Sequence, residues 1–232
     1  MITAAIVVAG GRGKRTGGEI PKQFCRLLQK PLLHYALDVF EAMAEINSII
    51  VVVPPEYAQM LQVRMDLKPF RKIRAVVGGG EIRQASVMKG LSVLPEETDF
   101  VVIHDGARPF PPAEETRKAL HLARESGAAI LALPISDTVK RGDASGLVLE
   151  TLDRRGLWQV QTPQVFRKDL ILRAYQKVLE KDLLVTDDAA AVELLGEPVR
   201  LVRGSTSNIK ITVREDFDIA AGIYQGGKER NG

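Results

Sequence analysis

Four basic side chains lie in or just after a glycine-rich turn near the start of the chain. The apolar run 4–9 ends in Gly10-Gly11-Arg12-Gly13, and the basic residues of this region are Arg12, Lys14, Arg15 and Lys22. Glycine lets backbone N–H groups approach a ligand closely and lets several of them point at one anion. A cradle of backbone N–H groups with convergent cations predicts a site for a polyphosphate.

The turn matches neither of two familiar phosphate-binding loops. The Walker loop requires a glycine, four residues and then Gly-Lys-Ser/Thr, but here Gly13-Lys14 is followed by Arg15. The dinucleotide fingerprint starts well at Gly11 and Gly13, but Thr16 stands at its third glycine position. A glycine turn alone leaves a plain structural turn open as the alternative, and the neighbouring cations favour the phosphate site.

Composition and charge bound the class of protein. The chain has 232 residues, 45% of them hydrophobic, and a formal net charge of +3. These values suit a single domain over 1–232 that binds an anionic small molecule. The sequence lacks the concentrated basic stripe that nucleic-acid binding favours, so no nucleic-acid partner is expected. One cysteine (Cys25), no visible signal peptide and no apolar stretch of membrane-spanning length together predict a cytoplasmic protein with no membrane partner.

Strand-like and helix-like segments alternate through most of the chain. The expected strands cover 4–9, 48–53, 73–77, 100–104 and 128–133, and the expected helices follow Pro31 and Arg83 and cover 168–181, 187–195 and 214–225. Alternating βα units predict an α/β fold with a mostly parallel central sheet flanked by helices. Ligands then bind at the carboxyl ends of the strands.

The alternation breaks at 136–160, which is polar and rich in turn residues. Two strand-like pieces, 137–140 and 147–152, surround Gly142 and Gly146. This pattern predicts a β-hairpin that protrudes from the domain, with a solvated surface loop as the alternative.

Asp105 follows the apolar run 100–103 and should therefore lie at the carboxyl end of a central strand. A carboxylate opposite a polyphosphate loop can hold Mg²⁺ or a ribose hydroxyl, whereas the alternative is a cap on the following turn. His104 is expected to pack and form hydrogen bonds rather than to catalyse.

A second glycine turn, Gly78-Gly79-Gly80, leaves the third expected strand, and Ser86 lies one turn into the next helix. Glycines permit close approach to a flat base, and the Ser86 hydroxyl can point at the same site. A flexible turn is the alternative. Thr186-Asp187-Asp188 is typical of a helix N-cap with acids in its first turn.

Nine short motifs follow one another from Ala9 to Lys210. They are A-G-G-R-G-K-R (9–15), P-K-Q (21–23), G-G-E-I-R-Q-A-S (79–86), H-D-G-A-R-P (104–109), D-T-V-K (137–140), D-R-R-G-L-W (153–158), Q-T-P-Q (161–164), T-D-D (186–188) and N-I-K (208–210). In the number and order of these motifs, the chain resembles the 2-C-methyl-D-erythritol 4-phosphate cytidylyltransferase family of non-mevalonate isoprenoid synthesis. Gly106 departs from the family, where alanine is common.

The resemblance implies a Rossmann-like nucleotidyltransferase fold and transfer of CMP from CTP to methylerythritol phosphate, with Mg²⁺ and release of pyrophosphate. Arg15 and Lys22 would hold the triphosphate and stabilise charge at the α-phosphorus. Asp105 would serve ribose, metal or both. The nucleotide pocket would be lined by Ala9, Gly10, Gly11, Gly13, Gly80 and Ser86, and the sugar phosphate would be surrounded by Arg108, Thr138, Arg154, Thr162, Thr186 and Lys210.

The family also implies a homodimer whose hairpin arms cross, so that Thr138 and Arg154 enter the partner's site. Arg154 and Lys210 would position the acceptor for the reaction. Two alternatives stay open: a cytidylyltransferase for ribitol 5-phosphate or another polyol phosphate, and a nucleotide-binding regulatory protein without turnover. Intact Arg15, Lys22, Asp105 and Lys210 argue against the regulatory protein.

Overall fold

A seven-stranded sheet forms the centre of the molecule, which is a computed structural model that describes residues 1–11, 20–64 and 70–231. The strand order is β11-β7-β10-β6-β1-β4-β5, and β10 alone runs antiparallel to its neighbours β6 and β7. Its strands are β1 (Thr3–Val8), β4 (Ser48–Val53), β5 (Ile73–Gly78), β6 (Phe100–Asp105), β7 (Ala128–Pro134), β10 (Trp158–Arg167) and β11 (Arg200–Arg203). The expected mostly parallel sheet is confirmed.

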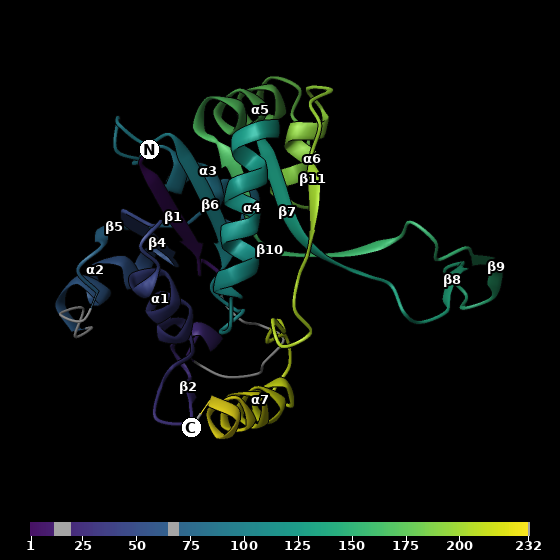
Figure 1. Ribbon diagram of the computed structural model, residues 1–232, viewed down its shortest axis with the longest axis horizontal. Helices are drawn as coiled ribbons and strands as arrows, with labels where there is room; N and C mark the ends of the chain where they lie inside the picture. The colour runs from purple at the N-terminus through teal and green to yellow at the C-terminus, as the bar shows by residue number, and fades with distance from the viewer. Residues whose placement is uncertain (12–19, 65–69, 232) are drawn as a thin grey trace.

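Helices cover both faces of this sheet (Figure 1). Alternate residues of each strand point to opposite faces, so Ala5 and Val7 of β1 pack in one cluster while Ile6 and Val8 pack in the other. The first face carries α1 (Leu32–Ala42), α2 (Pro55–Arg64) and α4 (Ala113–Ser126), and the second carries α3 (Arg83–Leu91), α5 (Lys168–Glu180) and α6 (Asp188–Glu193).

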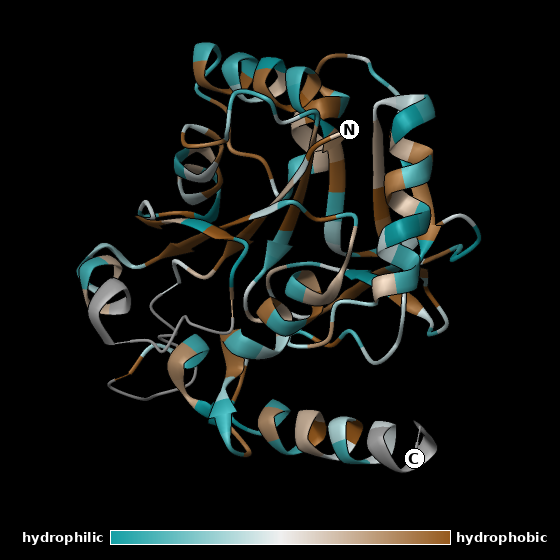
Figure 2. Ribbon diagram, turned by 60° about the vertical axis from the view of Figure 1, so that its left-hand side comes forward, coloured by the Kyte–Doolittle hydropathy of each residue, from teal (hydrophilic) through white to brown (hydrophobic). Residues whose placement is uncertain are grey.

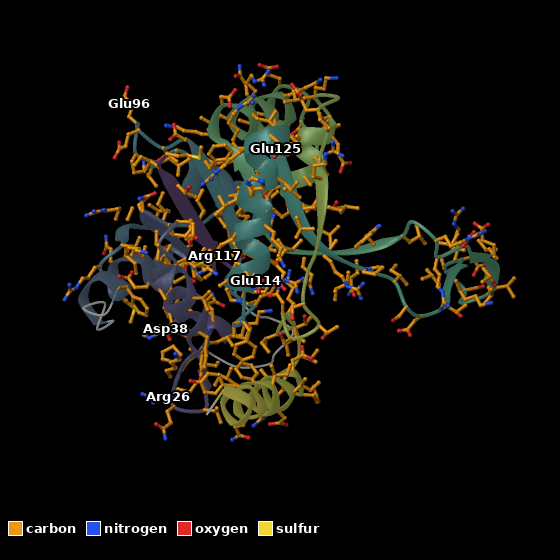
Figure 3. All side chains as sticks on the ribbon, in the orientation of Figure 1. Arg26, Asp38, Glu96, Glu114, Arg117 and Glu125 are labelled. Carbon is orange, nitrogen blue, oxygen red and sulfur yellow. The ribbon has the colours of Figure 1, made fainter. Side chains whose placement is uncertain are left out.

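The layers show the amphipathic pattern that such packing requires. Brown, hydrophobic stretches run along the strands while the helices alternate between brown and teal (Figure 2). Glu114, Arg117 and Glu125 of α4 lie on the outer side of the molecule (Figure 3), and Arg117 donates to Glu45 at 2.9 Å. Gly127 caps the C-terminal end of α4, and its φ of +84° is the left-handed conformation that glycine adopts without strain.

A smaller unit lies below the sheet and includes the C-terminal helix (Figure 1). It contains η2 (Lys22–Phe24), the short strands β2 (Arg26–Leu27) and β3 (Lys30–Pro31), and α7 (Asp216–Asn231). The ring of Tyr35 packs edge-on against those of Phe110 and Tyr224. The C-terminal helix is thereby fixed beside the segment that follows the first glycine turn (Figure 1).

The hairpin predicted at 136–160 is present, as a separate two-stranded sheet of β8 (Val139–Gly142) and β9 (Val148–Leu152). We call residues 136–157 the arm; it extends from β7 and β10 away from the body (Figure 1). Its predicted end at residue 160 is wrong, because Trp158, Gln159 and Val160 already pair with β7.

Other boundaries also differ from the sequence prediction. Strands β10 and β11 and helices α2 and α4 have no counterpart in it. The last helix begins at Asp216 rather than at 214, because the Asp216 carboxylate accepts the N–H groups of Thr212 and Val213 at 2.6 and 2.9 Å. It ends at Asn231 rather than at 225, and the helix expected over 187–195 covers Asp188–Glu193. No helix in the described part of the chain is long and apolar enough to cross a membrane.

Candidate active site

Two cavities lie side by side at the carboxyl ends of the parallel strands. The glycine cavity, of about 220 Å³, is lined by Val8, Ala9, Gly10, Gly11, Lys22, Gln23, Gly80, Glu81, Ile82, Arg83, Ser86, Asp105, Ala107 and Lys210. The threonine cavity, of about 430 Å³, is lined by Arg83, Asp105, Arg108, Ile130, Val160, Gln161, Thr162, Gln164, Thr186, Asp187, Ala190, Glu193 and Lys210. Arg83, Asp105 and Lys210 line both cavities and form a shared wall.

A wider depression of about 780 Å³ lies at the opposite edge of the sheet, where β1 and β6 begin. Several of its charged side chains are engaged with protein groups, as in the Arg167–Asp169 ion pair and the donation from Lys168 to the carbonyls of Pro95 and Glu96. Because parallel sheets bind ligands at the carboxyl ends of their strands, the two smaller cavities are the better candidates.

The first glycine turn is held by a buried glutamine. Gln23, 2% exposed, donates to the carbonyl oxygens of Ala9 and Gly11, the latter at 2.8 Å. A side chain at Gly10 would meet the Ser86 hydroxyl, since an added Cβ would lie 2.9 Å from it. Gln23 belongs to the P-K-Q motif, but its role could not be predicted from that motif.

The second glycine turn is held by Ser86. Its hydroxyl accepts the Gly80 N–H at 3.0 Å and donates to the Ile82 carbonyl at 3.1 Å. Ser86 lines the glycine cavity as predicted, but it is only 2% exposed. The Ser86 hydroxyl therefore shapes the backbone that faces the cavity, and its contact with a bound base stays a prediction.

Two of the predicted cations, Lys22 and Arg108, line different cavities. Lys22 lines the glycine cavity and donates to the Ile211 carbonyl at 2.6 Å. Arg108 lines the threonine cavity and donates to the Asn208 carbonyl at 2.7 Å. Arg15 and Gly13 lie outside the described residues.

The shared wall is an ion-pair network centred on Asp105. Arg83 Nε donates to Asp105 Oδ1 at 2.8 Å, and Lys210 Nζ donates to Asp105 Oδ2 at 2.7 Å. Burial alone would raise the pKa of Asp105, but the charges of Arg83 and Lys210 outweigh it and hold that pKa well below its ordinary value. Asp105 is therefore a carboxylate at neutral pH, and Arg83, which was not among the predicted site residues, is one of its two partners.

A hydrogen-bonded chain runs behind this carboxylate. The Arg108 carbonyl can only accept, so His104 donates to it from Nε2 at 2.9 Å. His104 Nδ1 then accepts from the Thr162 hydroxyl at 3.1 Å, and Thr162 accepts the Asp105 N–H at 3.0 Å. The expectation that His104 packs and forms hydrogen bonds is confirmed, and its neutral imidazole helps to fix both Thr162 and Asp105.

Thr186 reaches the threonine cavity from the start of α6. The helix N-cap predicted in Thr186-Asp187-Asp188 is present: Asp187 is the cap residue and accepts the Ala190 N–H at 3.0 Å, and Asp188 lies in the first turn. Gln164 of β10 donates to the other Asp187 oxygen at 2.8 Å and ties this cap to the central sheet.

Thr138 and Arg154 lie elsewhere. Both are exposed on the arm and line neither cavity, and Arg154 donates to the carbonyl of Ser136, also on the arm. Within one described chain, the structure therefore brings together Ala9, Gly10, Gly11, Lys22, Gly80, Ser86, Asp105, Arg108, Thr162, Thr186 and Lys210 but not these two residues.

Comparison with known proteins gives one consistent result. The family model described as 2-C-methyl-D-erythritol 4-phosphate cytidylyltransferase matches residues 3–225. Proteins of that name from Desulforamulus reducens and Pelotomaculum thermopropionicum are 47% and 42% identical, each aligned over 98% of this chain and 96% of the relative.

Solved structures agree with the sequence relatives. The crystal structure of 4-diphosphocytidyl-2C-methyl-D-erythritol synthase from Anaerococcus prevotii superposes with a TM-score of 0.84 at 32% identity, covering 97% of this chain and 96% of that one. The Thermus thermophilus 2-C-methyl-D-erythritol 4-phosphate cytidylyltransferase gives 0.79 at 30% identity, with coverages of 97% and 98%.

Proposed function

We propose, from the premise that the chain belongs to the 2-C-methyl-D-erythritol 4-phosphate cytidylyltransferase family, that it transfers CMP from CTP to 2-C-methyl-D-erythritol 4-phosphate. The products are 4-diphosphocytidyl-2-C-methyl-D-erythritol and pyrophosphate. The observation that carries the proposal is the wall of Arg83, Asp105 and Lys210 shared by a glycine-lined cavity and a neighbouring cavity rich in polar groups. Two substrates that contact the same three side chains from neighbouring cavities can be held close enough to react.

The transfer reaction depends mainly on positioning the two substrates and on stabilising their negative charge. An oxygen of the acceptor phosphate forms a bond to the α-phosphorus of CTP, and the bond from that phosphorus to the bridging oxygen of the β-phosphate breaks. The attacking phosphate is already an anion, so no general base is needed. The barrier lies in bringing two anions together, which fixed cations lower.

The nucleotide belongs in the glycine cavity. Backbone groups around Ala9, Gly10, Gly11, Gly13 and Gly80 receive the base and phosphates, with Ser86 fixing the second turn. Arg15 and Lys22 hold the triphosphate and stabilise charge at the α-phosphorus. Lys22 supports this role because it lines the cavity while anchored to the Ile211 carbonyl.

The acceptor belongs in the threonine cavity. Arg108, Thr162, Thr186 and Lys210 line it and offer cations and hydroxyl groups suited to a sugar phosphate. Lys210 is the one of these four that lines both cavities. It can therefore orient the attacking phosphate toward the nucleotide.

Magnesium fits the donor set of the nucleotide site. Asp105 and Glu81 bring carboxylates to the glycine cavity, and the described residues contain no cluster of three or more His, Cys, Asp or Glu side chains that could cage a metal. Mg²⁺ is commonly held by one or two carboxylates and substrate phosphates rather than by a protein cage. Asp105 would hold the ion, which would neutralise part of the triphosphate charge.

The arm is proposed to complete the acceptor site of a second copy. Leu147, Val148 and Leu149 are 65%, 56% and 58% exposed on a hairpin that pairs only with itself among the described strands. Such a two-stranded sheet is marginal alone, and a two-fold dimer with crossed arms would cover it. Thr138 and Arg154 would then contact the acceptor in the partner's site. The whole chain would act as one cytoplasmic domain, with no nucleic-acid or membrane partner.

The activity is tested by measuring pyrophosphate release with CTP and each of two acceptors, methylerythritol phosphate and ribitol 5-phosphate. Turnover with the first acceptor alone is the expected result. Turnover only with ribitol 5-phosphate would assign the chain to that alternative, and CTP binding without turnover on either acceptor would indicate a regulatory protein.

Complementation tests the arm. A Lys22→Ala chain and an Arg154→Ala chain are mixed under conditions that exchange subunits. If the arms cross, each heterodimer contains one site with both defects and one with neither, so activity partly returns. Heterodimers that form without regaining activity would show that the arm serves its own site.

A further inference from the structure

Asp188 is a buried carboxylate that lines neither cavity. It is 0% exposed, and it accepts two hydrogen bonds from Arg83, from Nη1 at 3.1 Å and from Nη2 at 2.7 Å. The Tyr175 hydroxyl donates to the same carboxylate at 2.5 Å, and burial raises the pKa of that phenol well above its ordinary value. A buried carboxylate is costly unless it is paired, and here its charged partner is a residue of the shared wall.

Arg83 connects this buried group to the site. Its guanidinium holds Asp188 with both terminal nitrogens and Asp105 with Nε, so one planar side chain joins two carboxylates. A fork of this kind fixes orientation as well as distance. Without Asp188, the end of the side chain would keep only its single Nε contact with Asp105 among the described residues.

The same end of α3 also holds the segment that carries Thr186. Gln84, next to Arg83, donates to the Leu183 carbonyl at 3.1 Å and accepts the Val185 N–H at 3.0 Å. Leu184 is 82% exposed, whereas Leu183 and Val185 pack partly against the core. Polar contacts from Arg83 and Gln84 add to this packing on both sides of Thr186.

We propose that Asp188 is a positioning residue for the transfer reaction. Through Arg83 it fixes the start of α6 to the shared wall, so that Thr186 keeps its place across the threonine cavity from Asp105. The inference rests on the proposed function, because it assigns the acceptor to that cavity. The glycine turns are held independently, by Gln23 and Ser86, so loss of Asp188 should disturb acceptor use much more than CTP binding.

The test compares Asp188→Asn with Tyr175→Phe. Asparagine has nearly the same shape but presents an N–H donor to one guanidinium nitrogen, which breaks the fork. We expect kcat/KM for methylerythritol phosphate to fall about tenfold to a hundredfold, as for a misplaced substrate contact. The Kd of CTP, titrated without acceptor, should stay close to that of the wild type.

Tyr175→Phe is the matched control, because it removes a hydrogen bond from the same carboxylate and leaves both Arg83 contacts in place. Its melting temperature should fall while its kcat/KM for the acceptor stays near that of the wild type. Equal kcat/KM values for Asp188→Asn and Tyr175→Phe would overturn the inference and leave the proposed function standing.

Arg83→Lys keeps the test decisive if Asp188→Asn does not fold. Lysine retains the positive charge but cannot pair with two oxygens in a fork, so a comparable fall in kcat/KM for the acceptor is expected. Where Asp188→Asn folds, adding it to Arg83→Lys should change kcat/KM little, since contacts acting in one chain are not additive. An Arg83→Lys chain with unchanged acceptor kinetics would overturn the inference, and a wild-type chain inactive on every polyol phosphate would overturn the proposed function together with it.

Discussion

Acidification should destabilise this protein through one buried imidazole. His104 is 0% exposed and has Arg108, Asp105 and Arg83 as its charged neighbours. Burial is the largest influence on it and lowers its pKa from 6.5 to about 4. A proton on Nδ1 would also face the Thr162 hydroxyl, which now donates to that nitrogen. Protonation therefore disturbs the chain that leads to the Asp105 N–H.

The size of the effect follows from this difference in pKa. Because the folded-state pKa lies below the unfolded-state value, the unfolded chain takes up the proton first as the pH falls. The contribution of neutral His104 is complete above about pH 6.5 and is lost between pH 6.5 and about pH 4. At about 1.4 kcal/mol for each pKa unit, the loss is on the order of 3 kcal/mol.

Urea unfolding at a series of pH values from 7 to 4 measures this loss, with His104→Gln as the reference. Glutamine can still donate to the Arg108 carbonyl, but it does not titrate. The variant will be less stable at pH 7, so the comparison concerns only the change in unfolding free energy between pH 7 and pH 4. This change should be smaller in the variant by on the order of 3 kcal/mol. Identical pH dependence in the two proteins would refute the argument.

Three further outcomes are expected. Lys22→Ala should lower kcat about a hundredfold or more, the effect of removing one fixed charge contact in a transition state, while a thermal melt shows a much smaller change in stability. Gly106→Ala should destabilise the chain by about 1–3 kcal/mol, because the added Cβ would lie 2.8 Å from Ala9 Cβ and 3.2 Å from Leu33 Cδ1; an unchanged melting temperature would contradict this packing. In competition assays CTP should be preferred to UTP and ATP, because a site that hydrogen-bonds one base leaves buried groups unpaired with another, and equal use of ATP would rule out the second glycine turn as a base site.

The parts of the site that lie next to strand ends could be predicted from the sequence. The apolar runs before Gly10 and Asp105 predicted strands over 4–9 and 100–104, within one residue of the observed ends at Val8 and Asp105. Parallel strands bring those ends to one edge. The order of the motifs added Lys210 and Thr186, which no local pattern would have selected. Site residues that lie directly after a regular strand can thus be predicted from the sequence.

The remainder depends on contacts between distant segments. Arg83 looks like the first residue of an ordinary helix, and Asp188 looks like an acid in the first turn of another. Their pairing joins residues 105 positions apart and appears only when α3 and α6 pack on the same face of the sheet. Strand β10 was missed for a different reason: Pro163 interrupts its pattern, and proline argues against a central strand. The register shift between Val160 and Gln164 accommodates it there.

The ion pairs of the site keep its charged side chains in place before two anionic substrates bind. Around the shared wall, Arg83 and Lys210 are balanced by Asp105 and Asp188, and every one of the four makes at least one ion pair. Unpaired cations crowded in such a site would repel one another and swing toward solvent. Paired with fixed carboxylates, they hold their directions before any ligand arrives, so little reorganisation is needed as charge develops during the reaction. Asp188 contributes to this arrangement from outside both cavities, because it holds the far end of Arg83 while Asp105 holds the near end.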